Sequence, residues 1–333
     1  MSNETGKKGV SRRDFLQKGT AAAVGTFFIV PRNLLRKGFI APSDKSNIAG
    51  IGVGGKAKKN FELHPKAKKY KDFRKMFDEM GKEIDAVTVS TTDHMHAIIA
   101  MAAMQQGKHV YVQKPLSHNI YEARMLTEAA RKYKVVTQMG NQGASNPAQV
   151  QMKEWFNKGL IGNVKEAHVW TNRPVWPQGI PVPQGKTAVP ADLDWDLWVG
   201  CADWVDYNPA WHPFKWRGWW NFGTGALGDM GCHLIDPAFR TLGLGYPTEV
   251  ECSVGSVFIK DWTPEYIPEG CPPSSRVQLK FPANKVNKTE MTMTWHDGGL
   301  RPFHPDLISA DEPLGEPDSS NGVMLIGEKG VMT

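Results

Sequence analysis

Residues 47–65 read NIAGIGVGGKAKKNFELHP, in which Gly50, Gly52 and Gly55 follow a short apolar run in the spacing G-x-G-x-x-G. In dinucleotide-binding proteins the first glycine permits a tight turn, the second lets the backbone approach a pyrophosphate, and the third lets a helix pack on the strand. The usual unit continues with a helix, a second strand and an acidic residue about 20 positions on. Here that window reads ELHPKAKKYKDF (62–73) and holds no apolar run. The stretch therefore predicts a phosphate-binding turn that opens an α/β domain, with no second strand after it.

Downstream of this stretch, apolar runs alternate with helical patterns. Strands are predicted at 47–53, 85–91, 108–113 and 134–139, and helices near 71–81, 95–106, 119–133 and 147–158. Strands buried on both faces and separated by helices are typical of a parallel, doubly wound sheet. We therefore predict a Rossmann-like domain over residues 46–158, whose last helix leads out of it.

From about residue 160 the pattern changes to alternating strands joined by long Pro- and Trp-rich connections. These strands are predicted at 163–172, 247–259, 274–282, 288–297 and 322–330. Period-two alternation with long connections is typical of a mostly antiparallel sheet packed beside the first domain. Residues 159–333 are therefore predicted to form an α+β domain.

The net charge of +6 is concentrated at the N-terminus. Residues 1–48 hold nine Lys and Arg against three Asp and Glu, and the remainder holds 31 of each, so the neutral body argues against a nucleic-acid partner. Arg12 and Arg13 precede an apolar stretch, 20–30, in the order of a twin-arginine export signal. We predict a signal and linker at 1–45 and an exported or periplasmic protein, held at a membrane only if the signal stays uncleaved. A surface helix with a chance Arg pair is the alternative.

Polar residues follow the strand predicted at 85–91 in TTDHMH (91–96). Thr91 and His96 are expected at the carboxyl edge of the sheet, where ligands bind in such folds. A cap on the next helix is the alternative role for His96. His94 and His96 at i, i+2 are also compatible with a metal site, although no third or fourth ligand is evident. The four cysteines are too few and too scattered for a zinc site or a disulfide framework, and up to two disulfides remain open.

The following strand ends in VQKPLSHN, which places Lys114 at the same edge, held by Pro115. A lysine there can contact both a substrate hydroxyl and a nicotinamide ring. The strongest local pattern is GALGDMGCHLID, in which Asp229 and His233 lie at i, i+4 on one helix face. Near Lys114, His233 would be a credible general base, with Asp229 either fixing its orientation or binding the same hydroxyl. A capping Asp229 and a buried His233 form the structural alternative.

Nine of the twelve tryptophans lie between Trp170 and Trp220. A core or interface cluster accounts for most of them. Because Trp offers a flat apolar face and a polar N–H, a platform for a sugar ring is the second interpretation. The candidates for that platform are Trp176, Trp216, Trp219 and Trp220.

In the order GIGVGG, TTDHMH, QKP and GDMGCHLID, these motifs resemble the Gfo/Idh/MocA oxidoreductases over residues 46–333, and the leader resembles their exported bacterial branch. The resemblance implies a Rossmann domain that binds NAD or NADP, with NAD favoured. It also implies a C-terminal domain whose open sheet often forms oligomer contacts, and hence a homo-oligomer. A sugar, cyclitol or glycoside would bind between the domains.

The resemblance also implies roles for single residues. Lys114 matches the lysine of a Glu-Lys-Pro motif with Gln113 in place of the Glu, Asp229 and His233 match the catalytic acid and histidine, and His96 matches a residue of the cofactor site. His233 would remove a hydroxyl proton while hydride passes to the nicotinamide, and Lys114 and Asp229 would hold the oxygen. The cofactor residues implied are Gly50, Gly52, Gly55, Thr91, His96, Gln113, Lys114 and Pro115, and the substrate residues are Lys114, Trp176, Trp216, Asp229 and His233.

Two departures from the family pattern bear on these expectations. Relatives place a helix, a strand and an acidic residue between the glycines and a segment like 58–73, and this chain lacks them; Glu62 and Asp72 are acidic, but neither ends an apolar run. The last residues, 322–333, resemble a strand that relatives follow with more chain, which leaves a truncated second domain open.

Four functions remain open on the sequence alone. The first is a carbohydrate oxidoreductase that retains its nicotinamide cofactor. The second is an NAD-dependent glycosidase that oxidises, eliminates, adds water and reduces back. A non-catalytic sugar-binding pseudoenzyme and a metal hydrolase built on His94 and His96 are the others.

Overall fold

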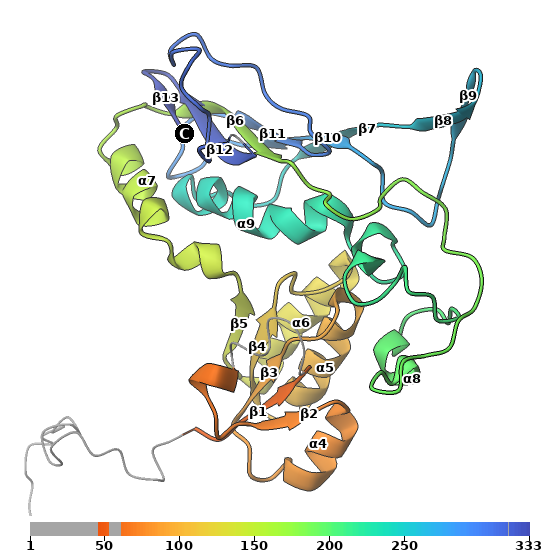
Figure 1. The fold of residues 1–333 in the computed structure, drawn as a ribbon. Helices are drawn as coiled ribbons and strands as arrows, with labels where there is room; N and C mark the ends of the chain where they lie inside the picture. Colours follow the sequence, from red (N-terminus) through yellow and green to blue (C-terminus); the bar gives the residue numbers. More distant parts are fainter. Residues whose placement is uncertain (1–45, 53–60, 319) are drawn as a thin grey trace, which may run out of the picture. The chain divides into compact units, whose positions relative to one another are not determined.

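The computed structural model describes residues 46–52, 61–318 and 320–333 (Figure 1). The export signal predicted at 1–45 and the position of Gly55 lie outside the described residues. Within those ranges, no helix combines the length and the apolar character that crossing a membrane requires.

The first sheet has five strands in the order β2-β1-β3-β4-β5, and all of its strand pairs are parallel. Its strands are β1 (Ile48–Ile51), β2 (Lys68–Tyr70), β3 (Ala86–Val89), β4 (His109–Gln113) and β5 (Thr137–Gly140). The helices that alternate with them are α4 (Phe73–Met80), α5 (Asp93–Gln105) and α6 (Ile120–Tyr133). The predicted Rossmann-like sheet is confirmed.

β2 corrects the prediction that the window 62–73 holds no second strand. It pairs with β1 along its whole length, with Ala49 opposite Lys68 and Ile51 opposite Tyr70. Because β2 is a three-residue edge strand whose two lysines are exposed, main-chain hydrogen bonds rather than an apolar run hold it in the sheet. Hydrophobic periodicity cannot reveal a strand of this kind.

Local signals fix the helices that position the later motifs. Asn119 and Glu122 form a capping box at the start of α6, and Asn146 caps α7 (Pro147–Asn157), which carries Pro at its first position. The core beneath them is formed by the buried valines of β3 and β4, such as Val89 and Val112. The parallel strands thus end at one fixed edge, where the polar motifs begin.

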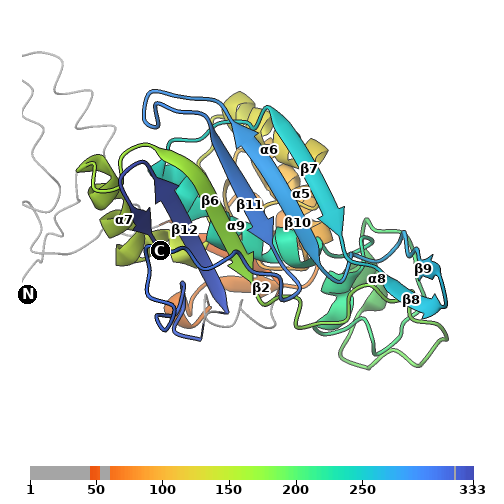
Figure 2. The same ribbon diagram turned by 90° about the horizontal axis from the view of Figure 1, so that it is seen from above.

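The second sheet has six strands in the order β13-β12-β6-β11-β10-β7. They are β6 (Val164–Thr171), β7 (Glu249–Val254), β10 (Ser275–Phe281), β11 (Met291–His296), β12 (Asn321–Gly327) and β13 (Val331–Met332). Only the pair of β6 and β11 is parallel among these described strands, so the mostly antiparallel prediction is confirmed. The helix α9 (Gly225–Thr241) packs on one face, and the opposite face is turned to the viewer in Figure 2 with no described helix across it.

The long connection from β6 to α9 contains the helix α8 (Trp195–Val199) and the short 3₁₀ helix η4 (Lys215–Gly218). Its aromatic residues form a separate apolar cluster that includes Trp195, Trp211 and Trp219. The core interpretation is therefore confirmed for these three tryptophans. A hairpin of β8 (Val257–Lys260) and β9 (Thr263–Glu265) projects from the sheet beyond β7 (Figures 1 and 2).

Candidate active site

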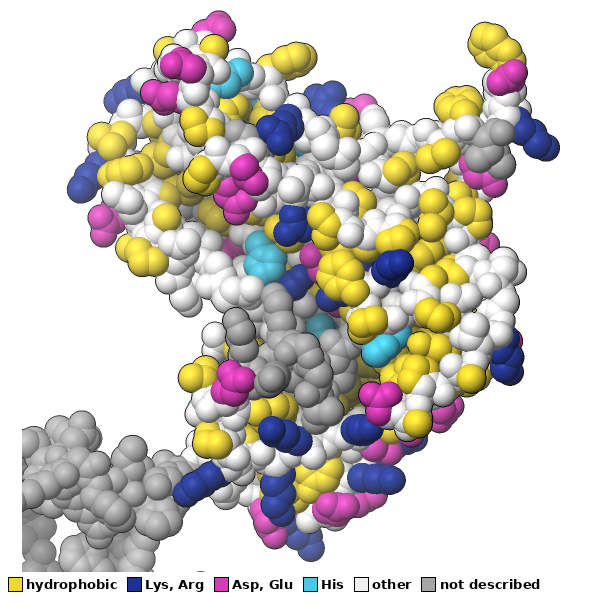
Figure 3. Space-filling view, viewed as in Figure 1, with side chains coloured by type: hydrophobic (Ala, Val, Ile, Leu, Met, Phe, Trp, Pro, Cys, Tyr) yellow, Lys and Arg dark blue, Asp and Glu magenta, His cyan; other side chains and the backbone are white. Residues whose placement is uncertain are grey.

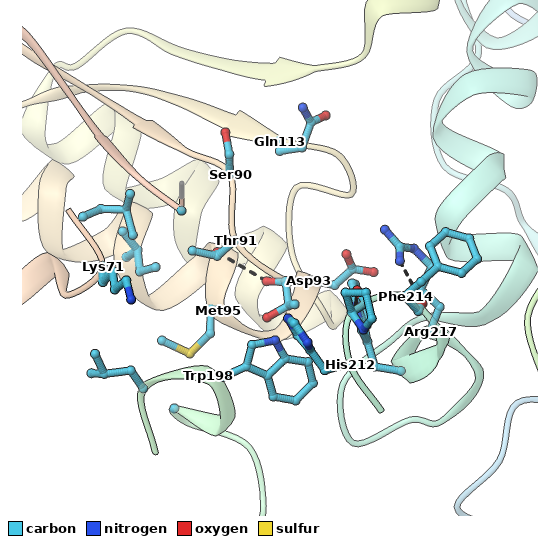
Figure 4. Close-up of a pocket in the computed structure, with 18 of the residues that line it drawn as sticks. Lys71, Ser90, Thr91, Asp93, Met95, Gln113, Trp198, His212, Phe214 and Arg217 are labelled. Carbon is cyan, nitrogen blue, oxygen red and sulfur yellow. Dashed lines mark hydrogen bonds between the residues drawn. The ribbon is translucent and has the colours of Figure 1, made fainter. Parts of the chain in front are cut away.

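A cavity of about 1440 Å³ lies between the carboxyl edge of the parallel sheet and the helix α9. The connection that contains α8 and η4 also contributes to its lining. Figure 3 shows the hollow between the two halves of residues 46–333, with histidine and basic side chains in its wall. Figure 4 shows side chains entering it from both sides, among them Lys71, Ser90, Thr91, Asp93, Gln113, Phe214 and Arg217. Its size suits a dinucleotide together with a small substrate.

The glycine turn after β1 fits a dinucleotide. Gly52 lines the cavity with φ +85°, and a Cβ there would lie 2.4 Å from the main-chain oxygen of Ser90. Ser90 also lines the cavity, and its buried hydroxyl has no hydrogen-bond partner among the described residues. At Gly50, a Cβ would lie 2.5 Å from the ring of Phe61. Gly52 thus lets the turn pack on the main chain of Ser90 at the cavity wall, and Gly50 lets Phe61 pack on β1.

The acidic residue beside this turn is Asp72. It follows β2 directly, lines the cavity, and caps α4 by accepting from the main-chain N–H of Arg74. The guanidinium of Arg74 also donates to both carboxylate oxygens at 3.0 Å, and these side-chain hydrogen bonds lower the pKa of Asp72. A carboxylate therefore stands at the carboxyl end of the strand next to β1, where ribose-binding acids lie in Rossmann folds.

Lys114 and Asp229 form an ion pair across the cavity. The Lys114 Nζ lies 2.6 Å from Asp229 Oδ1 and 3.0 Å from the Asp229 main-chain oxygen, and both side chains are about one-tenth exposed. Gln113 accepts from the main-chain N–H of Lys114 through its side-chain oxygen and thereby orients the end of β4. The fold thus brings Lys114, at the end of β4, to Asp229, in α9, as the two motifs predicted.

Arg217 adds a second cation to this pair. Its Nε lies 3.3 Å from Asp229 Oδ1, and its guanidinium lies 4.3 Å from the ring centre of Trp216. Burial works against ionisation of Asp229, but the charges of Lys114 and Arg217 outweigh it and lower the pKa of Asp229. Asp229 is therefore a carboxylate at neutral pH and orients both cations.

A second carboxyl group, Asp93, lies in the cavity wall at the start of α5. Burial raises the pKa of Asp93 to about 7, although the charges of Arg217 and Lys114 act in the opposite direction. Thr224 donates a hydrogen bond of 3.3 Å to it. The site therefore combines one carboxylate held ionised with one carboxyl group that titrates near neutrality.

His233 lines the cavity one helical turn after Asp229, and its Nδ1 lies 2.6 Å from the side-chain oxygen of Asn141. Nδ2 of Asn141 in turn donates a hydrogen bond of 2.5 Å to the main-chain oxygen of Cys232. Asn141 thus contacts the ring of His233, while Asp229 is engaged by Lys114 and Arg217. Both roles considered for Asp229, orienting His233 and binding the substrate oxygen, stay predictions.

His96 lies behind the cavity wall and not in it. Its ring is fully buried, with Nδ1 2.6 Å from the Pro115 oxygen and Nε2 3.2 Å from the Thr91 oxygen. It sits within α5, so it is not the helix cap; that position belongs to Thr92. Pro115 is also buried outside the cavity lining. His96 therefore links the loops that carry Thr91 and Lys114, and the direct contact of His96 and Pro115 with a cofactor stays a prediction.

The ring of His94 serves the structure as well. Its Nε2 lies 2.9 Å from the Trp198 oxygen and its Nδ1 3.4 Å from the Phe222 oxygen, and burial lowers the pKa of His94 to about 4. Within the described ranges, no group of three or more His, Cys, Asp or Glu is placed to hold a metal ion. The cysteines at 201, 232, 252 and 271 are all free thiols in the structure.

The four candidate tryptophans divide into two pairs. Trp176 and Trp216 line the cavity, with Trp176 edge-on to Phe214 at 5.8 Å between ring centres. Trp219 is fully buried in the aromatic cluster, and Trp220 lines a smaller, separate pocket. Of the four candidates, Trp176 and Trp216 therefore lie at the cavity wall, although both are largely buried and Trp216 also belongs to the aromatic cluster.

Sequence reasoning missed Asp93, Asn141 and Arg217. Asn141 directly follows β5 just as Lys114 directly follows β4, so the rule that found the lysine could have found it. Asp93 lies inside the quoted motif TTDHMH and was passed over for the histidines. Arg217 carries no such signal, because its place depends on how the Trp-rich connection folds.

The comparisons with known proteins agree with this geometry. The model described as "Oxidoreductase family, NAD-binding Rossmann fold" matches residues 22–141, and that described as "Oxidoreductase family, C-terminal alpha/beta domain" matches 162–257. Levoglucosan dehydrogenase of Pseudarthrobacter phenanthrenivorans is 27% identical over 195 residues, which is 58% of this chain and 40% of the relative. Inositol 2-dehydrogenase of Salmonella typhimurium is 27% identical over 118 residues, 35% of this chain and 34% of the relative. The chain thus spans less than half the length of these curated relatives.

Among solved structures, the WlbA dehydrogenase from Bordetella pertussis, in complex with NADH and UDP-GlcNAcA, superimposes with a TM-score of 0.56 at 15% identity. The match covers 86% of this chain and 78% of that one. At this identity the likeness establishes the fold alone.

Proposed function

This chain belongs to the Gfo/Idh/MocA family of oxidoreductases, and from that premise we propose that it oxidises or reduces a ring hydroxyl of a sugar, cyclitol or glycoside with a nicotinamide cofactor. The observation that carries the proposal is the meeting of Lys114, Asp229 and His233 in one cavity, from two chain segments, the end of β4 and the helix α9. A lysine and a histidine beside one carboxylate can bind an alcohol and take its proton.

The cavity wall fits the cofactor. Gly52 provides the close approach that a pyrophosphate needs, and Thr91, Gln113 and Lys114 line the path from it toward α9. Asp72 favours NAD over NADP, because its carboxylate can accept from ribose hydroxyls and repels a 2′-phosphate. A bound nicotinamide would supply the hydride acceptor or donor of the reaction.

The chain's own residues handle the proton and the developing charge. In the oxidation direction, His233 Nε2 accepts the proton of the substrate hydroxyl. Lys114 has three N–H donors, and among the described contacts two of them go to Asp229, so one is available for the substrate oxygen. Arg217 donates a second hydrogen bond to Asp229 and stabilises its carboxylate form, which opposes proton transfer from Lys114 to Asp229. Trp176 and Trp216 would pack on the ring of the substrate.

We propose that residues 1–45 direct the protein outward by the twin-arginine route, since Arg12 and Arg13 precede an apolar stretch in signal order. That route carries folded proteins, so a cofactor bound before export would stay with its enzyme. We further propose a homo-oligomer that uses the open face of the six-stranded sheet.

The test is turnover of a sugar panel by the purified chain: levoglucosan and myo-inositol with NAD or NADP, and 1,5-anhydro-D-fructose with NADH or NADPH. His233→Ala is expected to abolish turnover, and His304→Ala, on an exposed loop, is the matched control that leaves it unchanged. A sugar that both variants turn over at the same rate overturns the assignment of His233. Cleavage of a glycoside without net reduction of NAD would identify the glycosidase version of the chemistry.

A further inference from the structure

We infer that Asn141 is a positioning residue that holds His233 in the tautomer with its proton on Nδ1, so that Nε2 is the unprotonated nitrogen of the neutral ring. The inference deepens the proposed function and rests on the role assigned there to His233. The residues lie in different domains: Asn141 directly follows β5, and His233 belongs to α9.

The orientation of the Asn141 amide is set by a second contact. Its Nδ2 donates to the main-chain oxygen of Cys232 at 2.5 Å, and its Oδ1 lies 2.6 Å from Nδ1 of His233. Turning the amide over would place its oxygen against the Cys232 carbonyl, where two acceptors would repel. The amide oxygen therefore faces the imidazole.

The protonation state of the ring follows from this orientation. An amide oxygen can only accept, so Nδ1 of His233 must be the donor in this hydrogen bond. A neutral imidazole carries a single N–H, which leaves Nε2 with its lone pair. The contact thus selects the tautomer that a general base at Nε2 requires.

The main chain around Asn141 is itself fixed. Its N–H donates to the Met139 oxygen at 2.9 Å, and its own oxygen accepts from Ala144 at 3.1 Å at the start of the 3₁₀ helix η3 (Gln142–Ser145). Arg240 of α9 donates to the Ala144 oxygen at 3.2 Å, so the loop and α9 are joined at two places. Asn141 is also largely buried, with 8% of its surface exposed. The amide therefore has little freedom to leave the ring.

The choice of an amide in place of a carboxylate has a chemical consequence. A carboxylate opposite Nδ1–H would stabilise the imidazolium and keep the ring protonated to higher pH. The neutral amide of Asn141 orients the ring without placing a negative charge beside it.

The test uses the full chain with ¹⁵N-labelled histidine, read by the ring nitrogen shifts across a pH titration. His233→Ala assigns the His233 signals. In the wild type, Nδ1 is expected to be protonated and Nε2 unprotonated above the ring's titration. Asn141→Ala should lose this preference, and Asn141→Asp should keep it but move formation of the imidazolium to higher pH. Asn146→Asp is the matched control: Asn146 caps α7 in the same loop, and aspartate caps helices equally well.

A wild-type ring protonated on Nε2 would overturn the inference, and so would an Asn141→Ala ring that keeps the wild-type tautomer. These readings need no substrate, so they separate this inference from the proposed function. Absence of turnover together with the Nδ1–H tautomer would leave the role of Asn141 in place and remove only the proposed reaction.

Discussion

Nζ of Lys114 lies 2.6 Å from Oδ1 of Asp229, although the two residues are 115 positions apart in the chain. Both side chains are about one-tenth exposed, so each charge depends on the other. Attraction between buried charges offsets their desolvation only while the pair is intact. This ion pair therefore joins the end of β4 to α9. It also keeps both side chains charged inside the cavity.

Replacing Asp229 with Ala is expected to lower the free energy of unfolding by about 3–5 kcal/mol, because it leaves the Lys114 ammonium buried without its carboxylate. Urea denaturation of the variant measures this. Glu249→Ala is the control: it breaks the exposed pair with Lys280, also 2.6 Å long, and should cost less than about 1 kcal/mol. Equal losses in the two variants would contradict the account of a buried, interdependent pair.

Asp93 predicts a pH-dependent stability. Burial raises the pKa of Asp93 from 3.8 to about 7, so its contribution to stability is complete below about pH 4 and is lost as the pH rises through about 7. Asp93→Asn removes this titration. At about pH 8 its free energy of unfolding should exceed that of the wild type by on the order of a few kcal/mol, seen as a higher melting temperature, and this difference should shrink toward about pH 4. A difference that stays constant over this range would show that Asp93 is ionised throughout in the fold.

Asp72 is expected to set the choice between NAD and NADP. Asp72→Ser removes the carboxylate and releases the guanidinium of Arg74, which can then bind a 2′-phosphate. The ratio of the dissociation constants for the two cofactors should move toward NADP by about tenfold or more, measured by titration calorimetry. Asp78→Ala, on the exposed side of the same helix, is the control. An unchanged ratio would remove Asp72 from the cofactor site.

Gly52→Ala tests the turn. The change adds both the strain of φ +85° and a Cβ 2.4 Å from the Ser90 oxygen. Gly107→Ala adds the strain alone, since Gly107 has φ +71° and nothing within 4 Å of its Cβ position. Gly52→Ala should therefore lose more than the roughly 1 kcal/mol expected at Gly107 and should also weaken dinucleotide binding. If the two variants behave alike in both measurements, the close approach at Gly52 has no part in binding.

The sequence could predict the parallel sheet because its strands are apolar runs between helices with clear caps, as at Asn119 and Asn146. It could not predict β2, whose Lys68 and Lys69 face solvent and whose pairing depends on main-chain bonds to β1. The same limit hid Asp72 as a cavity residue, since its place follows from that strand.

The candidate site divides in the same way. Lys114 and His233 were found because each stands in a local pattern that ends a strand or lies on a helix face. Asn141 also directly follows a strand and could have been found by the same rule. Arg217 stands in no such pattern, because its contact with Asp229 depends on how the Trp-rich connection folds. Local patterns identify which residues can do chemistry, whereas tertiary packing decides which neighbours tune them.

The most direct test of the account is to denature the purified protein and analyse the released small molecules for nicotinamide dinucleotides by absorbance and mass spectrometry. The account predicts a near-stoichiometric amount of NAD or NADH, because the turn at Gly52 and the carboxylate of Asp72 together complete the site beside β1. No dinucleotide released, and none bound when either cofactor is added, would contradict it.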